Sequence, residues 1–135
     1  FDLLNVENSA SESTYAQFAW GIEGELIPHQ GNAFEVINET ASSLSINAKA
    51  TNIHTSDIFY RKDSGIPAVA EKYNCLAVEM EAFALFANAK YLGKNAATIL
   101  TVSDVIPTHE QISADERERA LKPMIELALE SAIKL

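Results

Sequence analysis

The sequence predicts an α/β fold with a mixed or parallel central sheet flanked by helices. Residues 76–78 are a short aliphatic run after polar residues, and residues 96–102 are apolar or β-branched throughout, so we expect two buried strands. Between them, residues 82–92 are rich in Ala, Leu and Phe and stop at Gly93, as is typical of a helix and its C-terminal cap. This order predicts a βαβ unit in which the two strands are parallel neighbours with their carboxyl ends at one edge.

Acidic side chains follow both predicted strands. Glu79 and Glu81 come directly after the first strand, and Asp104 comes shortly after the second. Ligands of open α/β sheets bind at the carboxyl edge, so we expect these carboxylates to lie together at a ligand site. The alternative is that Glu79 and Glu81 are solvated acids at a helix N-terminus and that Asp104 caps a turn.

The composition bounds the class of protein. With 135 residues, 47% hydrophobic and 21% charged, the chain is long enough for one domain with a core and is not expected to be disordered. A net charge of -9 argues against a nucleic-acid surface, and no apolar run approaches a membrane span. The single cysteine, Cys75, excludes an internal disulfide, and without a signal-peptide pattern we expect a cytoplasmic protein. No spacing indicates a metal site, and no glycine-rich phosphate loop is present.

The first half of the chain is expected to supply further elements around the βαβ unit. Residues 1–7 are expected to form a strand and residues 24–31 a loop. A helix is expected to begin after Asn32 and to end near residue 44. Weak alternation over residues 46–53 indicates another strand.

Aromatic residues are concentrated in two places. Tyr15, Phe18 and Trp20 are spaced as if to pack in a core or a subunit contact. Residues 58–60 read as a short exposed apolar segment after a turn.

The second half is expected to end in a long amphipathic helix. Residues 67–73 are expected to form a short helix that begins with proline, and residues 105–111 a loop. Ser113 and Glu116 have the capping-box pattern of a helix N-terminus, and the helix should run near to Ile133. Its apolar stripe is expected to comprise Ala120, Leu121, Met124, Ile125, Ala128, Leu129 and Ala132.

Several segments, in this order along the chain, resemble one family. They are Ser56-Asp57-Ile58-Phe59-Tyr60, Val78-Glu79-Met80-Glu81-Ala82, Val102-Ser103-Asp104, Thr108-His109-Glu110-Gln111 and Glu116-Arg117. Together they resemble the hexameric, bacterial-type purine nucleoside phosphorylases of the nucleoside phosphorylase and nucleosidase superfamily. The resemblance runs from about Asn52 to the last residue, with Val105 and Pro107 departing from the more polar residues common in the family.

The resemblance implies phosphorolysis: a purine nucleoside and inorganic phosphate give free base and ribose 1-phosphate, with phosphate as co-substrate and no cofactor. Cleavage of the glycosidic bond needs a general acid that protonates the departing base at N7. Asp104 matches that acid, and Arg117 matches the arginine that acts with it. An arginine beside an ionised carboxylate opposes its protonation, so we expect the pair to approach only in a closed, liganded state.

The resemblance also implies a nucleoside-binding set. Glu81 matches the carboxylate that accepts hydrogen bonds from the ribose hydroxyls, and Met80 matches the apolar floor under the sugar. The residues that match the base pocket are Phe59, Val78, Glu79 and Ser103.

In the family, phosphate is held by Gly, Arg and Ser residues of the amino-terminal half, and none of those motifs occurs here. Residues 1–135 therefore resemble the carboxy-terminal part of a single nucleoside phosphorylase domain that apparently lacks its amino-terminal half. The resemblance implies a homo-hexamer in which neighbouring subunits complete each site. The alternatives are a nucleosidase of the same superfamily, or an inactive fragment that only binds nucleoside or assembles with other subunits. A uridine phosphorylase is disfavoured, since Asp104 suits purine N7.

Overall fold

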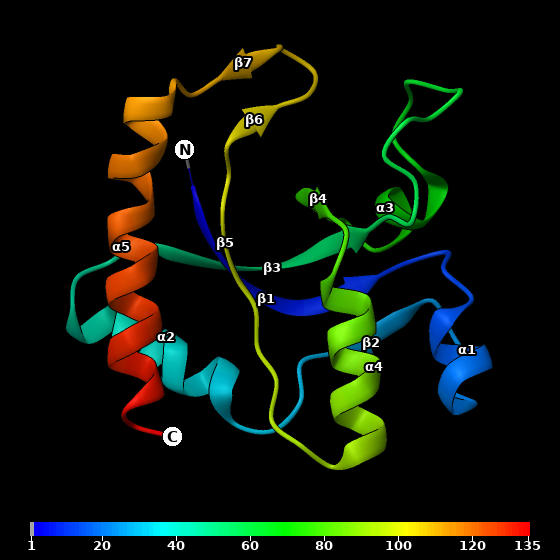
Figure 1. Ribbon diagram of the computed structural model, residues 1–135, viewed down its shortest axis with the longest axis horizontal. Helices are drawn as coiled ribbons and strands as arrows, with labels where there is room; N and C mark the ends of the chain where they lie inside the picture. Colours follow the sequence, from blue (N-terminus) through cyan, green and yellow to red (C-terminus); the bar gives the residue numbers. More distant parts are fainter. Residues whose placement is uncertain (1) are drawn as a thin grey trace.

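The computed structural model describes residues 2–135 and contains one five-stranded mixed sheet, a two-stranded hairpin and five helices (Figure 1). The elements in chain order are β1 (Leu3–Ala10), α1 (Tyr15–Trp20), β2 (Leu26–Pro28), α2 (Ala33–Ser43), β3 (Ala48–Thr55), α3 (Ala68–Lys72), β4 (Ala77–Glu79), α4 (Ala82–Leu92), β5 (Ile99–Thr101), β6 (Asp104–Val105), β7 (Glu110–Gln111) and α5 (Ala114–Ala132). The α/β class predicted from the sequence is confirmed.

The sheet is organised around β1. On one edge, β1 pairs with β3 in parallel, and β3 pairs in parallel with β4. On its other edge, residues 8–10 pair with β2 and residues 3–5 pair with β5, both antiparallel. The sheet is therefore mixed, with parallel strands on one side of β1 and two short antiparallel strands sharing the other.

The prediction that β4 and β5 are parallel neighbours is wrong. β3 and β1 lie between them, and β5 runs antiparallel to β1 and hence to β4. Their carboxyl ends consequently lie beside opposite ends of β1. Periodicity and composition indicate that a segment is a strand, but the direction and partner of β5 are set by β1, a strand about ninety residues earlier in the chain.

Two segments predicted to be loops are strands. β2 is a three-residue edge strand that ends at Pro28, where a missing N–H is tolerated. β6 and β7 form a hairpin in which Asp104 faces Gln111. Both are too short for a periodic pattern, so only their pairing partners define them as strands.

Two hydrophobic cores hold the helices to the sheet. Val6, together with Phe83 and Phe86 of α4, belongs to one core, and Leu3, together with Leu127 of α5, belongs to the other. Val6 and Leu3 point to opposite faces of β1 because side chains alternate along a strand. β1 therefore contributes to both cores, which makes it the central element of the fold.

The apolar stripe predicted for α5 is only partly buried. Leu127 is fully buried, whereas Ile125 is 50% exposed and Leu129 is 64% exposed. The helix packs against α2 and β5 along a narrower face than the sequence pattern predicts, so part of the stripe borders an open groove. Within residues 2–135, no helix has the length and apolarity needed to cross a membrane.

The three predicted aromatic contacts differ in burial. Trp20 packs against the core around α4, and its indole N–H donates to Asn88 at 2.6 Å. Tyr15 is 40% exposed and donates its hydroxyl to the same Asn88 oxygen at 2.8 Å. Phe18 is 82% exposed, so it does not contribute to the core of this chain.

Candidate functional site

The turn between β4 and α4 carries two of the predicted acidic residues, in different environments. Glu79 is half-buried, and one of its carboxylate oxygens accepts the backbone N–H groups of Glu81 and Ala82, both at 2.8 Å. Its other oxygen accepts the hydroxyl of Thr55. Glu81 is exposed, and its carboxylate accepts only the N–H of Met80, at 3.2 Å, among the described residues. Glu81 is therefore open to a ligand, whereas Glu79 is occupied by the helix N-terminus.

Apolar side chains lie exposed close to this turn. Val78 and Met80 are 46% and 40% exposed, and Phe59 is 75% exposed in the segment that follows β3. That segment leaves β3 beside β4, because the N–H of Ser56 donates to the carbonyl of Glu79 at 2.9 Å. An aromatic ring, a thioether and a carboxylate of this kind can bind the apolar face of a base and the hydroxyls of a sugar.

A charged cluster anchors the segment that carries Phe59. Arg61 donates to Glu12 at 2.5 Å, and the buried ring of His54 lies 2.6 Å from the other oxygen of Glu12. Partial burial acts to raise the pKa of Glu12, but hydrogen bonds from His54 and Arg61 outweigh it and hold that pKa below its ordinary value. The cluster joins residues after β1, in β3 and in the 57–66 segment.

Asp104 begins the β6–β7 hairpin. Its side chain is exposed, and its carboxylate accepts a hydrogen bond from the hydroxyl of Ser103. The backbone carbonyl of Ser103 accepts the N–H of Ile112 at 3.2 Å, which closes the base of the hairpin. Ser103 and Asp104 are thus fixed in backbone and open in side chain.

Arg117 lies in the first turns of α5, directly after the hairpin. The capping box between Ser113 and Glu116 is present as predicted, and the hydrogen bonds from Ser113 hold the pKa of Glu116 below its ordinary value. The side chain of Arg117 is exposed, and between residues 2 and 135 no ion pair joins it to Asp104. The two residues are close in sequence across a short hairpin, but their side chains are not in contact.

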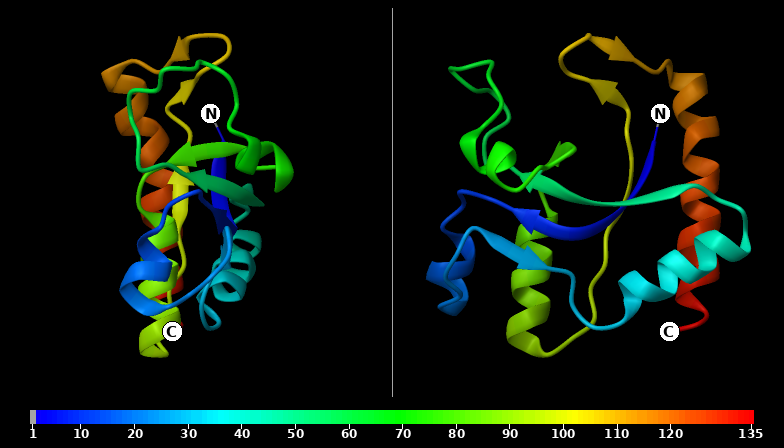
Figure 2. Two further views of the ribbon diagram at one scale, coloured as in Figure 1. Left: turned by 90° about the vertical axis from the view of Figure 1, so that its right-hand side faces the viewer. Right: turned by 180° about the vertical axis from the view of Figure 1, so that it is seen from behind.

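A bend in β1 relates the two halves of the candidate site. The register between β1 and β3 shifts between Val6 and Asn8, which forms a β-bulge of the kind that bends a strand. β1 runs down from the N-terminus and then turns across the molecule, so that β6 and β4 lie toward the same end in all views (Figures 1 and 2). The predicted βαβ unit does not bring Glu81 and Asp104 together, so their juxtaposition stays a prediction. Within residues 2–135, no hydrogen bond or ion pair joins Asp104 or Arg117 to Glu81.

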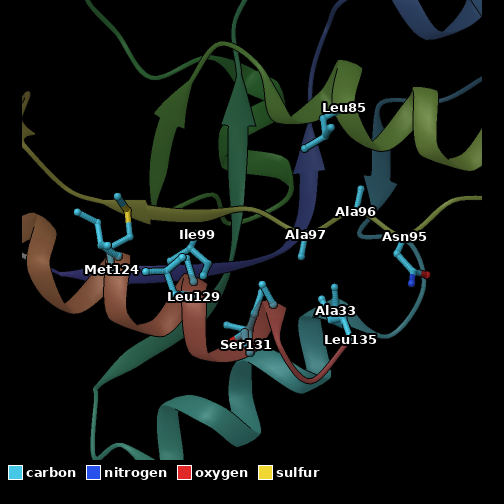
Figure 3. A pocket seen from close by; sticks show the side chains of 14 residues that line it. Ala33, Leu85, Asn95, Ala96, Ala97, Ile99, Met124, Leu129, Ser131 and Leu135 are labelled. Carbon is cyan, nitrogen blue, oxygen red and sulfur yellow. The ribbon is translucent and has the colours of Figure 1, made fainter.

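An apolar groove lies away from these residues. It has a volume of about 620 Å³ and lies between α5, α2 and the segment before β5 (Figure 3). Its lining is apolar except for Asn95 and Ser131, and it includes no ionisable side chain. The groove therefore offers no side chain of this chain for proton transfer.

Comparison with known proteins identifies the family. Residues 31–133 match the family model of the phosphorylase superfamily. The chain belongs to the phosphorylase superfamily.

One curated relative of this chain is the DeoD-type purine nucleoside phosphorylase of Mycoplasma genitalium, which is 38% identical over 137 residues. The match covers 99% of this chain and 57% of the relative, so the chain spans little more than half of the relative's length.

Solved structures share the fold. A purine nucleoside phosphorylase from Toxoplasma gondii in complex with immucillin-H matches with a TM-score of 0.79 and 16% identity, over 96% of this chain and 54% of that one. A 5'-methylthioadenosine/S-adenosyl homocysteine nucleosidase from Campylobacter jejuni matches with a TM-score of 0.81 and 23% identity, over 99% and 62%. This chain therefore shares its fold with a phosphorylase and with a nucleosidase.

The superfamily motifs account for the exposed residues of the site but not for those that support them. Thr55, Ser9 and the Glu12 cluster were not predicted, although buried polar residues at the ends of otherwise apolar strands are a signal for such support. Cys75 is half-buried, and burial raises the pKa of its thiol, as expected for an inert cysteine. Over residues 2–135, no three His, Cys, Asp or Glu side chains are grouped so as to hold a metal ion.

Proposed function

We propose that this chain forms the nucleoside-binding part of a purine nucleoside phosphorylase of purine salvage, acting on ribonucleosides and deoxyribonucleosides. The 38% identity to a DeoD-type purine nucleoside phosphorylase over 99% of the chain is the observation that supports this most. We propose further that residues 1–135 are the carboxy-terminal part of one domain. Inorganic phosphate would then be bound by residues outside this chain.

In this proposal Glu81 binds the sugar. Its exposed carboxylate can accept two ribose hydroxyls through charge-assisted hydrogen bonds, which strengthen as positive charge develops on the ribose. Met80 lies under the sugar as an apolar surface, while the base is held against Phe59 and Val78, with Glu79 at the edge of the same pocket.

Asp104 protonates the base at N7 as the glycosidic bond breaks. In the structure Ser103 donates to the Asp104 carboxylate, which suits the ionised form. When Asp104 carries a proton on its other oxygen, Ser103 can still donate to the carboxyl group, which leaves that proton available to N7. The same contact therefore holds the acid in place before and after proton transfer. Arg117 approaches Asp104 when α5 and the hairpin close over the nucleoside.

The proposed assembly is a homo-hexamer in which neighbouring subunits complete each site. The exposed apolar residues near the turn, including Phe59, would be covered by ligand and by neighbouring chain.

The test supplies the remainder of the relative's length, on the same polypeptide or as a second chain, and measures release of hypoxanthine from inosine. We expect release to require phosphate and to yield ribose 1-phosphate. Asp104→Asn should lower turnover by roughly 10²–10⁴-fold without changing the fold, because it removes the general acid. Asp63→Asn, an exposed carboxylate of the 57–66 segment, serves as the matched control.

Base release at the same rate without phosphate, with free ribose as product, would contradict phosphorolysis and favour the nucleosidase alternative. That outcome would agree with the fold that this chain shares with a nucleosidase.

A further inference from the structure

We propose that Thr55, acting with Ser9 and Glu79, is a positioning residue that holds Glu81 in place for the sugar. This inference rests on the proposed function, because it concerns the same site. It assigns Glu79 a role in holding Glu81, besides its place at the edge of the base pocket.

The N-terminus of α4 is capped from outside the helix. The first N–H groups of a helix have no partner within it and are usually satisfied by the side chain of the N-cap residue. Here the N-cap residue is Glu81, and its own side chain caps nothing. Instead, Glu79 accepts the N–H groups of Glu81 and Ala82 at 2.8 Å, and the Thr55 hydroxyl oxygen accepts that of Phe83 at 3.1 Å.

The hydroxyl groups form a chain with one direction. A hydroxyl has a single proton to donate, and Thr55 donates it to Glu79. At the contact between Ser9 and Thr55, where the oxygens are 2.6 Å apart, Ser9 must therefore be the donor. Ser9 is 0% exposed and Thr55 is 2% exposed, so the chain runs from the core to the carboxylate without competition from water.

The backbone on both sides of this chain is also fixed. Ser11 donates to the carbonyl of Thr55 at 2.7 Å, and the N–H of Ser56 donates to the carbonyl of Glu79 at 2.9 Å. The peptide group that precedes Glu81 is also held, because the N–H of Glu81 donates to the carboxylate of Glu79. The position of Glu81 is thus set by β1 and β3, which are the central strands of the sheet.

This arrangement leaves the Glu81 carboxylate available. Were it to cap α4 itself, as an N-cap side chain ordinarily does, its oxygens would be consumed by the backbone. Because Glu79 and Thr55 accept the first N–H groups of α4 instead, Glu81 remains exposed at the positive end of the α4 dipole, where an anion is stabilised. The two carboxylates thus have separate roles, Glu79 toward the helix and Glu81 toward the ligand.

The experiment is a double-mutant cycle in the enzyme completed with the remainder of the relative's length, with inosine and phosphate as substrates. Thr55→Val keeps the shape and removes the hydroxyl, while Thr55→Ser keeps the hydroxyl and serves as the matched control. We expect Thr55→Val to lower kcat/KM about tenfold, Thr55→Ser to restore it, and Thr55→Val to have no further effect in a Glu81→Ala background. An equal loss in both backgrounds would show a general structural role and overturn the proposal.

A second measurement needs no activity. Hydrogen exchange of the Glu81 and Ala82 amides should accelerate in Thr55→Val but not in Thr55→Ser, while amides in the middle of α5 stay unchanged. Unchanged exchange at Glu81 and Ala82 would overturn the proposal. Ser9→Ala, which removes only the upstream donor, should accelerate the same amides and remains informative if Thr55→Val does not fold. Absence of turnover in the parent enzyme would contradict the proposed function, whereas the exchange result reports on the positioning network alone.

Discussion

Glu12, which follows β1, contacts two residues much later in the chain. One of its oxygens is hydrogen-bonded to His54 and the other accepts a hydrogen bond from Arg61. A carboxylate with a lowered folded-state pKa contributes stability above its unfolded pKa, and this contribution is lost as the pH falls through the folded-state pKa. The anchor of the Phe59 segment should therefore weaken on acidification.

We predict that the free energy of unfolding decreases as the pH is lowered below the ordinary pKa range of glutamate. Glu12→Gln should reduce this decrease, because the substituted side chain no longer titrates. Urea unfolding between pH 7 and pH 3 measures it. Glu39→Gln is the control, since Glu39 is exposed and lies outside the Glu12 cluster. If the free energy of unfolding changes equally with pH in the parent and in Glu12→Gln, the contact of Glu12 with His54 and Arg61 is not populated.

At the scale of single residues, the sequence offered the exposed candidate groups of the site but not the buried residues that support Glu79. Glu81, Asp104 and Phe59 stand in family motifs with distinctive residue order. The support from Thr55 and Ser9 depends on which strands lie side by side, and no local pattern carries that information.

Among the elements, α4 and α5 follow from local physics. Apolar periodicity, a capping box and a glycine C-cap are short-range signals, and each appears where the sequence places it. The direction of β5 does not follow from such signals. It depends on the free edge of β1, and on a crossing near Gly31, where the backbone bridges between Gln30 and Ala96.

Gly31 is needed at this crossing for two reasons. Its φ is +73°, and a Cβ there would lie 1.7 Å from the Asn95 side-chain oxygen. We predict that Gly31→Ala destabilises the chain by about 1 kcal/mol more than Gly21→Ala, which has a similar φ of +66° but open space around it.

Chemical denaturation of the two variants measures the difference. Adding Asn95→Ala to Gly31→Ala should remove most of it, because the clash is with the side chain. If both glycine substitutions cost the same, the crossing is looser than described.

For the whole molecule, the chain spans 57% of a curated relative, and α5 presents an apolar surface that this chain leaves partly open. Leu127 lies fully buried on one side of the helix, whereas Leu129 is 64% exposed beside the groove. The two leucines therefore report separately on the covered and the open face.

We predict that Leu127→Ala lowers the free energy of unfolding by about 2–5 kcal/mol, as expected for a buried leucine. Leu129→Ala should change it by no more than about 0.5–1 kcal/mol in the isolated chain. Thermal or urea unfolding of both variants at matched concentration makes the comparison. A large loss for Leu129→Ala would mean that another surface already covers the groove.

In the proposed function Asp104 and Glu81 serve one nucleoside, although β5 and β4 end beside opposite ends of β1. Titration of the isotope-labelled chain with inosine, followed by amide chemical shifts, tests this most directly. We predict that the amides of residues 79–82 and of residues 103–104 shift together and fit one dissociation constant. Shifts confined to one of the two segments, or two segments that saturate at different inosine concentrations, would contradict it.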